Sequence, residues 1–285
     1  MNQTRSIIAV IADLHGGFEY GLLNPETILP KEGKNGGDTK YIPCLTESQE
    51  WLWECYTKDL ADLERLAGND RIVAILNGDM LQGNKHPSML VSNRMSDQVV
   101  IGQYNLAPLF SIKSVKVARF SIGTSAHNFG EGSGEFLVVD KIKSEHQEIN
   151  VGVQYHALLE VDGFLLDCAH HGPYPGSREW LRGNVARLYL KDIMIRAAGK
   201  GERLPNAVIR AHYHNYIKVM ETFGNNESWL FVSPSYSMLG DYTHQAARSP
   251  DTIKIGMFAL EIIDGELVHI HEFMRSIDVR SREIL

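Results

Sequence analysis

Runs of apolar residues divide the first part of the chain into short strands and longer helices. The segments Ile7 to Ile11 and Arg71 to Leu76 are rich in β-branched residues, which is typical of strands buried on both faces of a sheet. Between them, Thr46 and Gln49 form a capping-box pattern, and apolar residues recur at helical spacing until Gly68. This order of strand, helix and strand predicts that the two strands lie side by side and parallel.

The same alternation continues to residue 122. Residues 94 to 110 have a helical pattern, and Val115 to Ile122 forms a third strand that leads into a loop. By contrast, residues 18 to 37 are rich in Gly, Pro and Asn and show little periodicity, so we expect a long loop. We therefore predict one domain over residues 1 to 285, with a loop and helix elaboration at about 18 to 68.

Shorter segments follow from residue 136 and indicate a strand-rich second half. The predicted strands are Phe136 to Val139, Val151 to Val161, Phe164 to Ala169, Ala207 to Arg210, Ile217 to Thr222, Trp229 to Val232, Ile255 to Ile263 and Leu267 to Phe273. The pairs Asp162-Gly163 and Asp264-Gly265 are typical of tight turns between strands. One helix is predicted from about Ser177 to Ala198.

Composition narrows the class of protein. The 285 residues are 44% hydrophobic, which is enough for a sizeable core, and the net charge of -7 argues against a protein that coats nucleic acid through overall charge. Cys44, Cys55 and Cys168 show no Cys-x-x-Cys spacing, so neither a disulfide framework nor a zinc knuckle is indicated, and a reducing cytoplasm is expected. No apolar run reaches about 18 residues, so we expect a soluble protein without a cleaved signal or a membrane partner.

Acidic and imidazole side chains follow the ends of five predicted strands. They are Asp13 and His15, Asp79, His127, His170 and His171, and His212 and His214. Residues i and i+2 of an extended chain point to the same side, so Asp13 and His15 converge. The carboxyl ends of adjacent parallel strands meet at one sheet edge, which brings Asp79 towards Asp13. Unpaired buried charges are costly, and two divalent metal ions would satisfy all these side chains.

The order of these motifs resembles that of the calcineurin-like metallophosphoesterases, over roughly residues 7 to 215. The matching motifs are Asp13-x-His15, Gly78-Asp79, Gly123-x-x-x-His127, His171-Gly172 and His212-x-His214. The resemblance implies an α/β fold of mixed α+β character, a four-layer αββα sandwich, with two metals about 3.5 to 4 Å apart at the sheet edge. It also implies the ligands: Asp13, His15 and His214 for one metal, Asp79 as the bridge, and His171 and His212 for the other. We expect the last strands to cover the second sheet.

One motif departs from the family pattern. The usual third element is Gly-Asn-His, in which the Asn is a metal ligand, whereas this chain has Gly-Thr-Ser-Ala-His at 123 to 127 and resembles a variant found in phage and prophage members. The replacement for the Asn stays open among four candidates: Thr124, Ser125, Asn128 and water. Of the adjacent His170 and His171, the following Gly172 favours His171, and His170 stays a possible second ligand.

The resemblance implies hydrolysis of a phosphate ester by a metal-coordinated water, with Asp79 and His127 as catalytic residues. His127 would protonate the leaving oxygen or stabilise the transition state. Asp and His ligands suit manganese, iron, zinc or similar ions. Between residues 177 and 205 there are seven basic and three acidic side chains, which favours a nucleotide or nucleic-acid phosphodiester, although a solvated helix face explains them equally well. A phosphomonoesterase or protein phosphatase, and a catalytically silent binding scaffold of the same fold, stay open as alternatives.

Overall fold

The computed structural model describes residues 4–32, 38–85, 87–127, 133–174, 181–240, 250–281 and 283. Its first sheet contains, in order across the sheet, β13 (Glu266–Asp278), β12 (Thr252–Ile263), β1 (Arg5–Ile11), β4 (Arg71–Leu76), β5 (Val115–Ser121) and β6 (Asn150–Gln154). Its second sheet contains β10 (Ile217–Phe223), β11 (Asn226–Val232), β9 (Ala207–Arg210), β8 (Phe164–Ala169) and β7 (His156–Val161).

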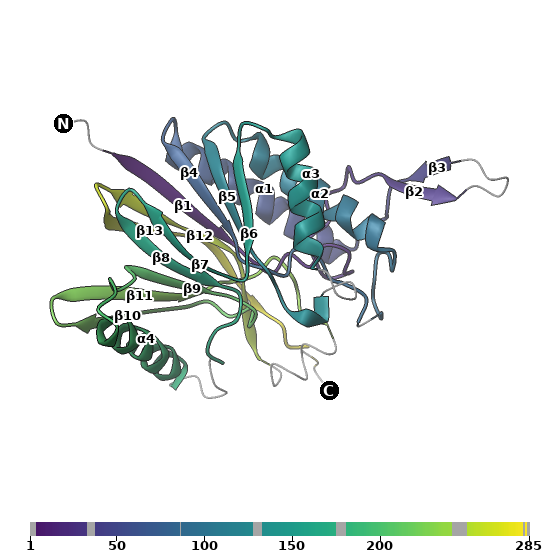
Figure 1. Cartoon of the computed structure of the whole chain (residues 1–285). Coiled ribbons are helices and arrows are strands. Elements are labelled where there is room, and N and C mark those ends of the chain that lie inside the picture. The colour runs from purple at the N-terminus through teal and green to yellow at the C-terminus, as the bar shows by residue number, and fades with distance from the viewer. Residues whose placement is uncertain are drawn as a thin grey trace.

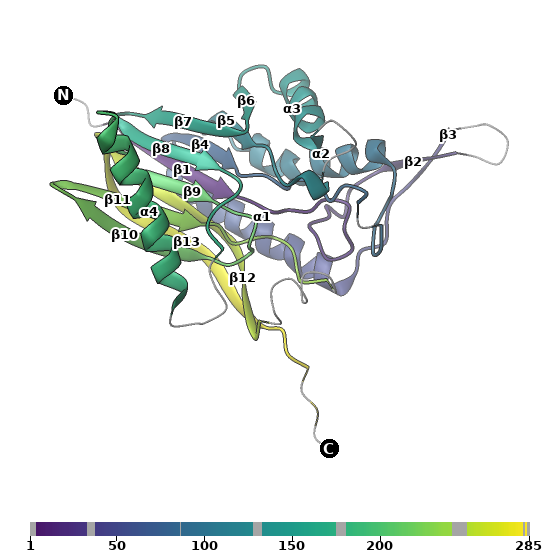
Figure 2. The same ribbon diagram turned by 60° about the horizontal axis from the view of Figure 1, so that its bottom comes forward.

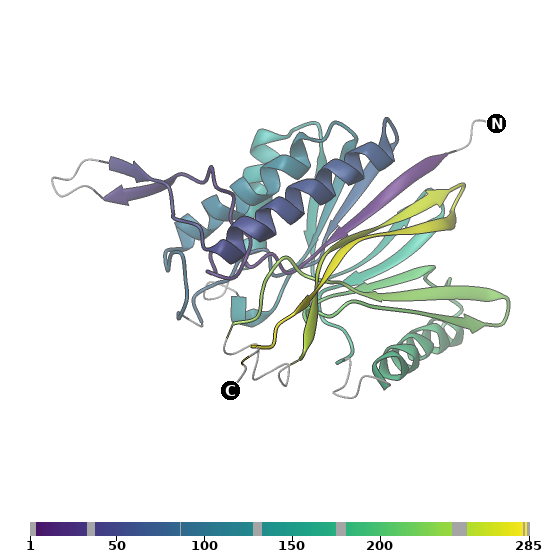
Figure 3. The ribbon, with the colours of Figure 1, turned by 180° about the vertical axis from the view of Figure 1, so that it is seen from behind.

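Helices cover the outer faces of both sheets (Figure 1). Three helices pack on the first sheet: α1 (Glu47–Ala67), α2 (Met95–Ser111) and α3 (Gly134–Glu145). Figure 3 shows α1 lying along that sheet, and Figure 2 shows α4 (Arg182–Gly199) lying over the second one. The four-layer αββα sandwich implied by the resemblance is therefore confirmed.

Strand β1 shows why its sequence is apolar at every position. Ile7, Ala9 and Ile11 belong to the core between the first sheet and its helices, whereas Ile8 and Val10 belong to the core between the two sheets. Both faces of the strand are buried, so no position is left for a polar side chain. The predicted helix after Thr46 is also confirmed, because the Thr46 hydroxyl accepts from Gln49 N and the Gln49 side chain accepts from Thr46 N.

Parallel pairing brings the strand ends together. Strand β1 pairs in parallel with β4, and β4 pairs in parallel with β5, so their carboxyl ends reach the same edge of the first sheet. In the second sheet, β8 and β9 are also parallel. The pairing continues beyond β1 and β4, since Asp13 N donates to Gly78 O across 3.0 Å and His15 N donates to Asp79 O across 3.0 Å.

Two strand predictions in the middle of the chain are wrong. Phe136 to Val139 lies in α3, which begins after Ser133, whose hydroxyl accepts from Glu135 N, and which buries Val138, Val139 and Ile142 at helical spacing. The predicted strand Val151 to Val161 is split at the exposed Tyr155. Its first half is β6 in the first sheet and its second half is β7 in the second sheet.

The expectations for the C-terminal strands and for residues 18 to 37 also need correction. Strand β12 pairs antiparallel with β1, and β13 pairs with β12, so both complete the first sheet and not the second. Within residues 18 to 37 and just beyond lie β2 (Leu29–Glu32) and β3 (Asp38–Tyr41), a hairpin that projects from the body of the molecule (Figure 1). Residues 33 to 37 lie outside the described part of the chain. Among the described residues, no helix combines the length and apolar character needed to cross a membrane.

Candidate metal centre

Acidic and imidazole side chains from both sheets converge where the parallel strands end. Asp13 and His15 follow β1, and Asp79 follows β4. His170 follows β8, and His212 and His214 follow β9. Together with His127 from the short 3-10 turn η1 (Ser125–His127), these residues form three overlapping groups whose nitrogen and oxygen atoms could hold a metal ion: Asp13, His15 and His214; His15, Asp79 and His127; and Asp79, His170 and His212.

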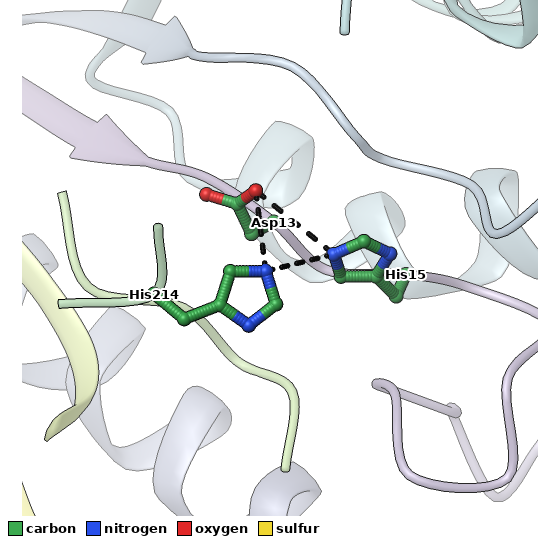
Figure 4. Close-up of side chains that lie close together, drawn as sticks. All are labelled: Asp13, His15 and His214. Carbon is green, nitrogen blue, oxygen red and sulfur yellow. Dashed lines mark hydrogen bonds and ion pairs between the residues drawn. The ribbon is translucent and has the colours of Figure 1, made fainter. Parts of the chain in front are cut away.

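The first of these groups is drawn in Figure 4. His214 Nε2 lies 3.4 Å from Asp13 Oδ1 and 3.0 Å from His15 Nε2, and His15 Nε2 lies 3.9 Å from the same carboxylate oxygen. The Asp13 side chain is fully buried. This group matches the three ligands that the resemblance assigns to one metal.

Asp79 lies between this group and the other ligand-type residues. Its Oδ2 is 2.9 Å from His170 Nε2, 3.9 Å from His212 Nδ1 and 3.7 Å from His127 Nε2. Asp79 takes part in two of the three groups, with His15 and His127 in one and with His170 and His212 in the other, and His15 also belongs to the first group.

The backbone around the centre adopts an unusual conformation. Eight non-glycine residues of the described chain have positive φ, and five of them are in the centre: Asp13 (53°), His15 (47°), Asp79 (52°), His212 (78°) and His214 (50°). Such residues are uncommon and cost roughly 1 to 3 kcal/mol each, so they persist only where the surroundings hold them. Main-chain hydrogen bonds between the loops after β1 and β4 support Asp13, His15 and Asp79, and His212 N donates to Asp13 Oδ2 across 3.3 Å.

Carbonyl oxygens orient three of the rings. His15 Nδ1 lies 2.9 Å from Gln82 Oε1, His127 Nδ1 lies 2.6 Å from the main-chain oxygen of Gln82, and His170 Nδ1 lies 2.6 Å from Asn77 O. Each Nδ1 must carry a proton to donate to an oxygen, so Nε2 is the nitrogen of each ring that faces the centre. The pKa of His15 is lowered to about 3, so its Nε2 keeps a lone pair, as expected for a ring that binds a metal.

Electrostatics keep the two carboxylates charged. Burial alone would raise the pKa of Asp13 and Asp79, but neighbouring imidazoles lower both, and that of Asp79 falls well below its usual range. Burial, His127 and His214 lower the pKa of His15 to about 3. Burial opposes protonation of His170, yet the charge of Asp79 and its hydrogen bond raise that pKa to about 10. The centre therefore holds two buried negative charges, which the protonated His170 ring offsets in part and a bound cation would offset further.

An unpaired polar atom shows that the centre fits divalent metals. Asp13 Oδ1 is buried and has no hydrogen-bond partner among the described residues, and the Nε2 of His214 lies 3.4 Å from it. The Nε2 lone pair of His15 faces His214 Nε2 and Asp13 Oδ1, an arrangement of acceptors that a bound cation would satisfy. Carboxylate oxygen together with imidazole nitrogen is a donor set that suits manganese, iron or zinc.

The structure places His170, and not His171, beside Asp79. The His171 side chain is exposed, and its ring packs edge-on against His212 with centroids 4.8 Å apart. This geometry favours His170 over His171 as a ligand, and the choice between them stays a prediction. The signal was available in the sequence: Leu166 and Cys168 face the core between the sheets, and continued alternation puts His170 on that same inner face.

The candidates to replace the missing Asn ligand differ in their position relative to Asp79. Thr124 contacts Asp79 through its main-chain nitrogen and through its hydroxyl. The Ser125 side chain is exposed, and Asn128 lies outside the described residues. Sequence reasoning missed Gln82 altogether, because a glutamine three residues after an acid carries no distinctive pattern.

Five of the basic side chains of residues 177 to 205 form ion pairs: Arg187, Lys191, Arg196, Lys200 and Arg203. Arg187 and Lys191 lie 3.7 and 3.6 Å from Glu221, and Arg203 lies 3.5 Å from Glu160. Helix α4, which carries the first two, packs on the outer face of the second sheet (Figure 2). These contacts favour the interpretation as a solvated helix face. Residues 175–180 lie outside the described part.

Comparison with known proteins finds similarity to solved structures. No protein-family model and no curated protein matches the sequence. Similar solved structures include a predicted phosphoesterase of Streptococcus pneumoniae, at 10% identity over 97% of this chain and 99% of that chain, with a TM-score of 0.37. A second is Vps29 of Entamoeba histolytica in complex with zinc, at 11% identity over 95% of this chain and 98% of that chain, with a TM-score of 0.39. A third is a 5'-nucleotidase of Candida albicans, at 10% identity over 98% of this chain and 53% of that chain, with a TM-score of 0.41. At such low identities and TM-scores, the chemistry is assigned from the side chains of this chain alone.

Proposed function

We propose that this chain is a metal-dependent phosphoric ester hydrolase that holds two divalent ions between its sheets. The observation that carries the proposal is the position of Asp79, whose buried carboxylate is shared between two groups of potential ligands. Asp13, His15 and His214 would hold one ion, and His170 and His212 the other. When bound, such a pair of ions makes water a nucleophile at neutral pH and neutralises the charge of the phosphoryl group.

His127 is suited to act on the leaving group. Its Nδ1 is held by the main-chain oxygen of Gln82, so its Nε2 faces the centre, 3.7 Å from Asp79 Oδ2. The side chain is 15% exposed, whereas Asp79 is 1% exposed. An imidazole ring between the buried carboxylates and solvent can act as a general acid that protonates the oxygen of the leaving group.

The substrate we propose is a phosphodiester, of a nucleotide or a nucleic acid. An aromatic pair beside the centre supports this choice: the Tyr213 ring lies 4.9 Å from the His212 ring and 5.5 Å from the Tyr174 ring. Tyr174 is 39% exposed, so its ring offers a surface on which a base can stack. The ion-paired basic side chains of α4 give no support to a long polyanion.

Parallel assays of bis-p-nitrophenyl phosphate and p-nitrophenyl phosphate test the proposal. Metal-stripped protein would be supplied with Mn²⁺, and the Asp79→Asn variant would serve as the control. We expect metal-dependent release from the diester and a much slower release from the monoester. Faster monoester hydrolysis would favour the phosphomonoesterase alternative. No release from either ester with several metals would overturn the enzyme and favour a binding scaffold.

A further inference from the structure

The hydroxyl of Thr124 contacts all three members of the group formed by Asp79, His170 and His212. Its Oγ1 is 2.9 Å from Asp79 Oδ2, 3.2 Å from His170 Nε2 and 3.0 Å from His212 Nδ1. The Thr124 main-chain N–H also donates to Asp79 Oδ1, across 2.6 Å. The main chain and the side chain of Thr124 therefore both contact the Asp79 carboxylate.

The contacts around this hydroxyl bring several lone pairs together. The Asp79 carboxylate is an acceptor only, and the Thr124 oxygen keeps lone pairs beyond its single proton. The Nδ1 of His170 faces Asn77 O, so its Nε2 is the ring atom turned towards the hydroxyl and Asp79. A cation in contact with all of these atoms would take the place of the protons that join them, with the oxygen and nitrogen lone pairs pointing at it.

The spacing of the atoms also fits ligands of one ion. Oxygen and nitrogen ligands lie about 2.0 to 2.2 Å from a divalent metal, so two ligands at right angles are about 3 Å apart. The three distances from Thr124 Oγ1, between 2.9 and 3.2 Å, agree with this value.

We propose that the Thr124 hydroxyl completes the metal position formed by Asp79, His170 and His212, and that this position binds its ion more weakly than the other. The position formed by Asp13, His15 and His214 has a carboxylate of its own, in addition to the Asp79 that we propose both positions share. The Thr124 position has only the shared carboxylate, and its fourth ligand is a neutral hydroxyl. The two ions therefore bind in two separate steps. The inference rests on the proposed function for its metal centre, but its test measures metal binding and not turnover.

The test compares Thr124→Val, which has nearly the same shape without the hydroxyl, with Thr124→Ser, which keeps it. Binding of Mn²⁺ to metal-stripped protein would be followed by calorimetry, with thermal unfolding of the metal-free variants as the check on folding. We expect two steps in the wild type and in Thr124→Ser. In Thr124→Val the tighter step should remain and the weaker step should fall by tenfold or more.

A second pair of variants detects the contact directly. Thr124→Cys loaded with Co²⁺ should show the near-ultraviolet absorption of a thiolate bound to cobalt, whereas Ser125→Cys, with its exposed side chain one residue away, should not. Absence of this absorption in Thr124→Cys would overturn the inference. A Thr124→Val protein that binds both ions as the wild type does would also overturn it. Equal loss of both binding steps would overturn it too, because the hydroxyl would then act only by positioning Asp79.

The outcomes also separate this inference from the proposed function. A wild-type protein that binds two ions in two steps but hydrolyses no ester would overturn the function and leave the ligand role of Thr124 intact. If the wild-type protein hydrolyses the diester but Thr124→Val leaves the weaker metal-binding step unchanged, the proposed function stands and the ligand role of Thr124 is overturned. Binding of fewer than two ions would overturn both.

Discussion

Gln82 Oε1 accepts a hydrogen bond from His15 Nδ1 across 2.9 Å, and both side chains are buried. The same residue contacts a second ring through its main chain, where its carbonyl oxygen accepts from His127 Nδ1 across 2.6 Å. One residue therefore orients a proposed metal ligand and the proposed acid. Only the first contact depends on the glutamine side chain, so substitution can separate the two roles.

Replacing Gln82 by Leu should weaken metal binding without abolishing turnover. The variant removes the oxygen that holds His15, and loss of such supporting contacts typically costs 10 to 100-fold in metal affinity. The main-chain contact to His127 remains, so kcat at saturating Mn²⁺ should stay close to that of the wild type. Activity titrated with Mn²⁺ measures both quantities. Gln82→Glu keeps an acceptor and should retain most of the affinity; a Gln82→Leu protein with unchanged affinity would refute the role of this contact.

Replacing His127 by Asn should remove turnover and leave the metal content nearly unchanged. The loss of an acid at the leaving group corresponds to roughly 100 to 10,000-fold in kcat. Metal per chain, measured after dialysis, should fall in Asp79→Asn but not in His127→Asn. His269→Asn, an exposed position on β13, is the matched control and should change neither. Full activity of His127→Asn on the best substrate would show that its role is assigned wrongly.

The order of strands and acids could be predicted because burial leaves a clear pattern. Strand β1 is apolar at every position since both its faces are covered, and its parallel pairing with β4 carries Asp13 and Asp79 to one edge. The start of α1 could be predicted from Thr46 and Gln49, because a capping box depends only on two residues three positions apart. These features depend on neighbours in sequence or on a single pairing rule.

Features that depend on contacts between distant segments could not be predicted. Tyr155 separates strands of two different sheets, and no periodicity tells which sheet each half joins. The hydroxyl of Thr124 meets His170 and His212 only after β5, β8 and β9 are in place. The Gly172 that follows His171 favoured that histidine, whereas the alternation in β8 turns His170 towards Asp79.

Gly123→Ala should disturb the centre without removing any ligand. A Cβ at this position would lie 2.0 Å from Asp79 Oδ1 and 2.4 Å from Asp79 N, so the carboxylate or its loop must move. We expect weaker Mn²⁺ binding and a large loss of activity. Gly199→Ala, where a Cβ meets nothing within 4 Å, is the control and should be neutral. Wild-type metal binding by Gly123→Ala would mean that Asp79 can shift freely.

Glu135→Gln should stabilise the metal-free protein increasingly as the pH rises. Glu135 is 3% exposed, accepts from Met80 N across 3.3 Å, and has its pKa raised by burial. An acid with a raised pKa contributes stability below its unfolded pKa and loses it as pH rises through the folded value. A neutral glutamine avoids that loss. Urea unfolding of both proteins from pH 4 to 8 should show a difference that grows with pH; a constant difference would contradict the buried charge.

Arg275→Leu should strongly destabilise the fold, and Asp59→Asn should rescue it. Arg275 donates to both carboxylate oxygens of Asp59, across 2.6 and 2.7 Å, and thereby ties β13 to α1. Asp59 is 1% exposed, so removal of the arginine leaves a buried charge whose one remaining hydrogen bond among the described residues is from the Tyr236 hydroxyl. Breaking such a pair costs about 3 kcal/mol, and less here to the extent that Arg275 reaches solvent.

Urea unfolding of the two single variants and the double variant measures this coupling. The double variant should recover most of the free energy of unfolding lost in Arg275→Leu, because asparagine carries no charge that needs a partner. Arg280→Leu, which removes an exposed ion pair with Asp278, is the matched control and should have little effect. If the single and double variants lost the same free energy, the loss would come from the packing of the arginine side chain and not from the buried carboxylate.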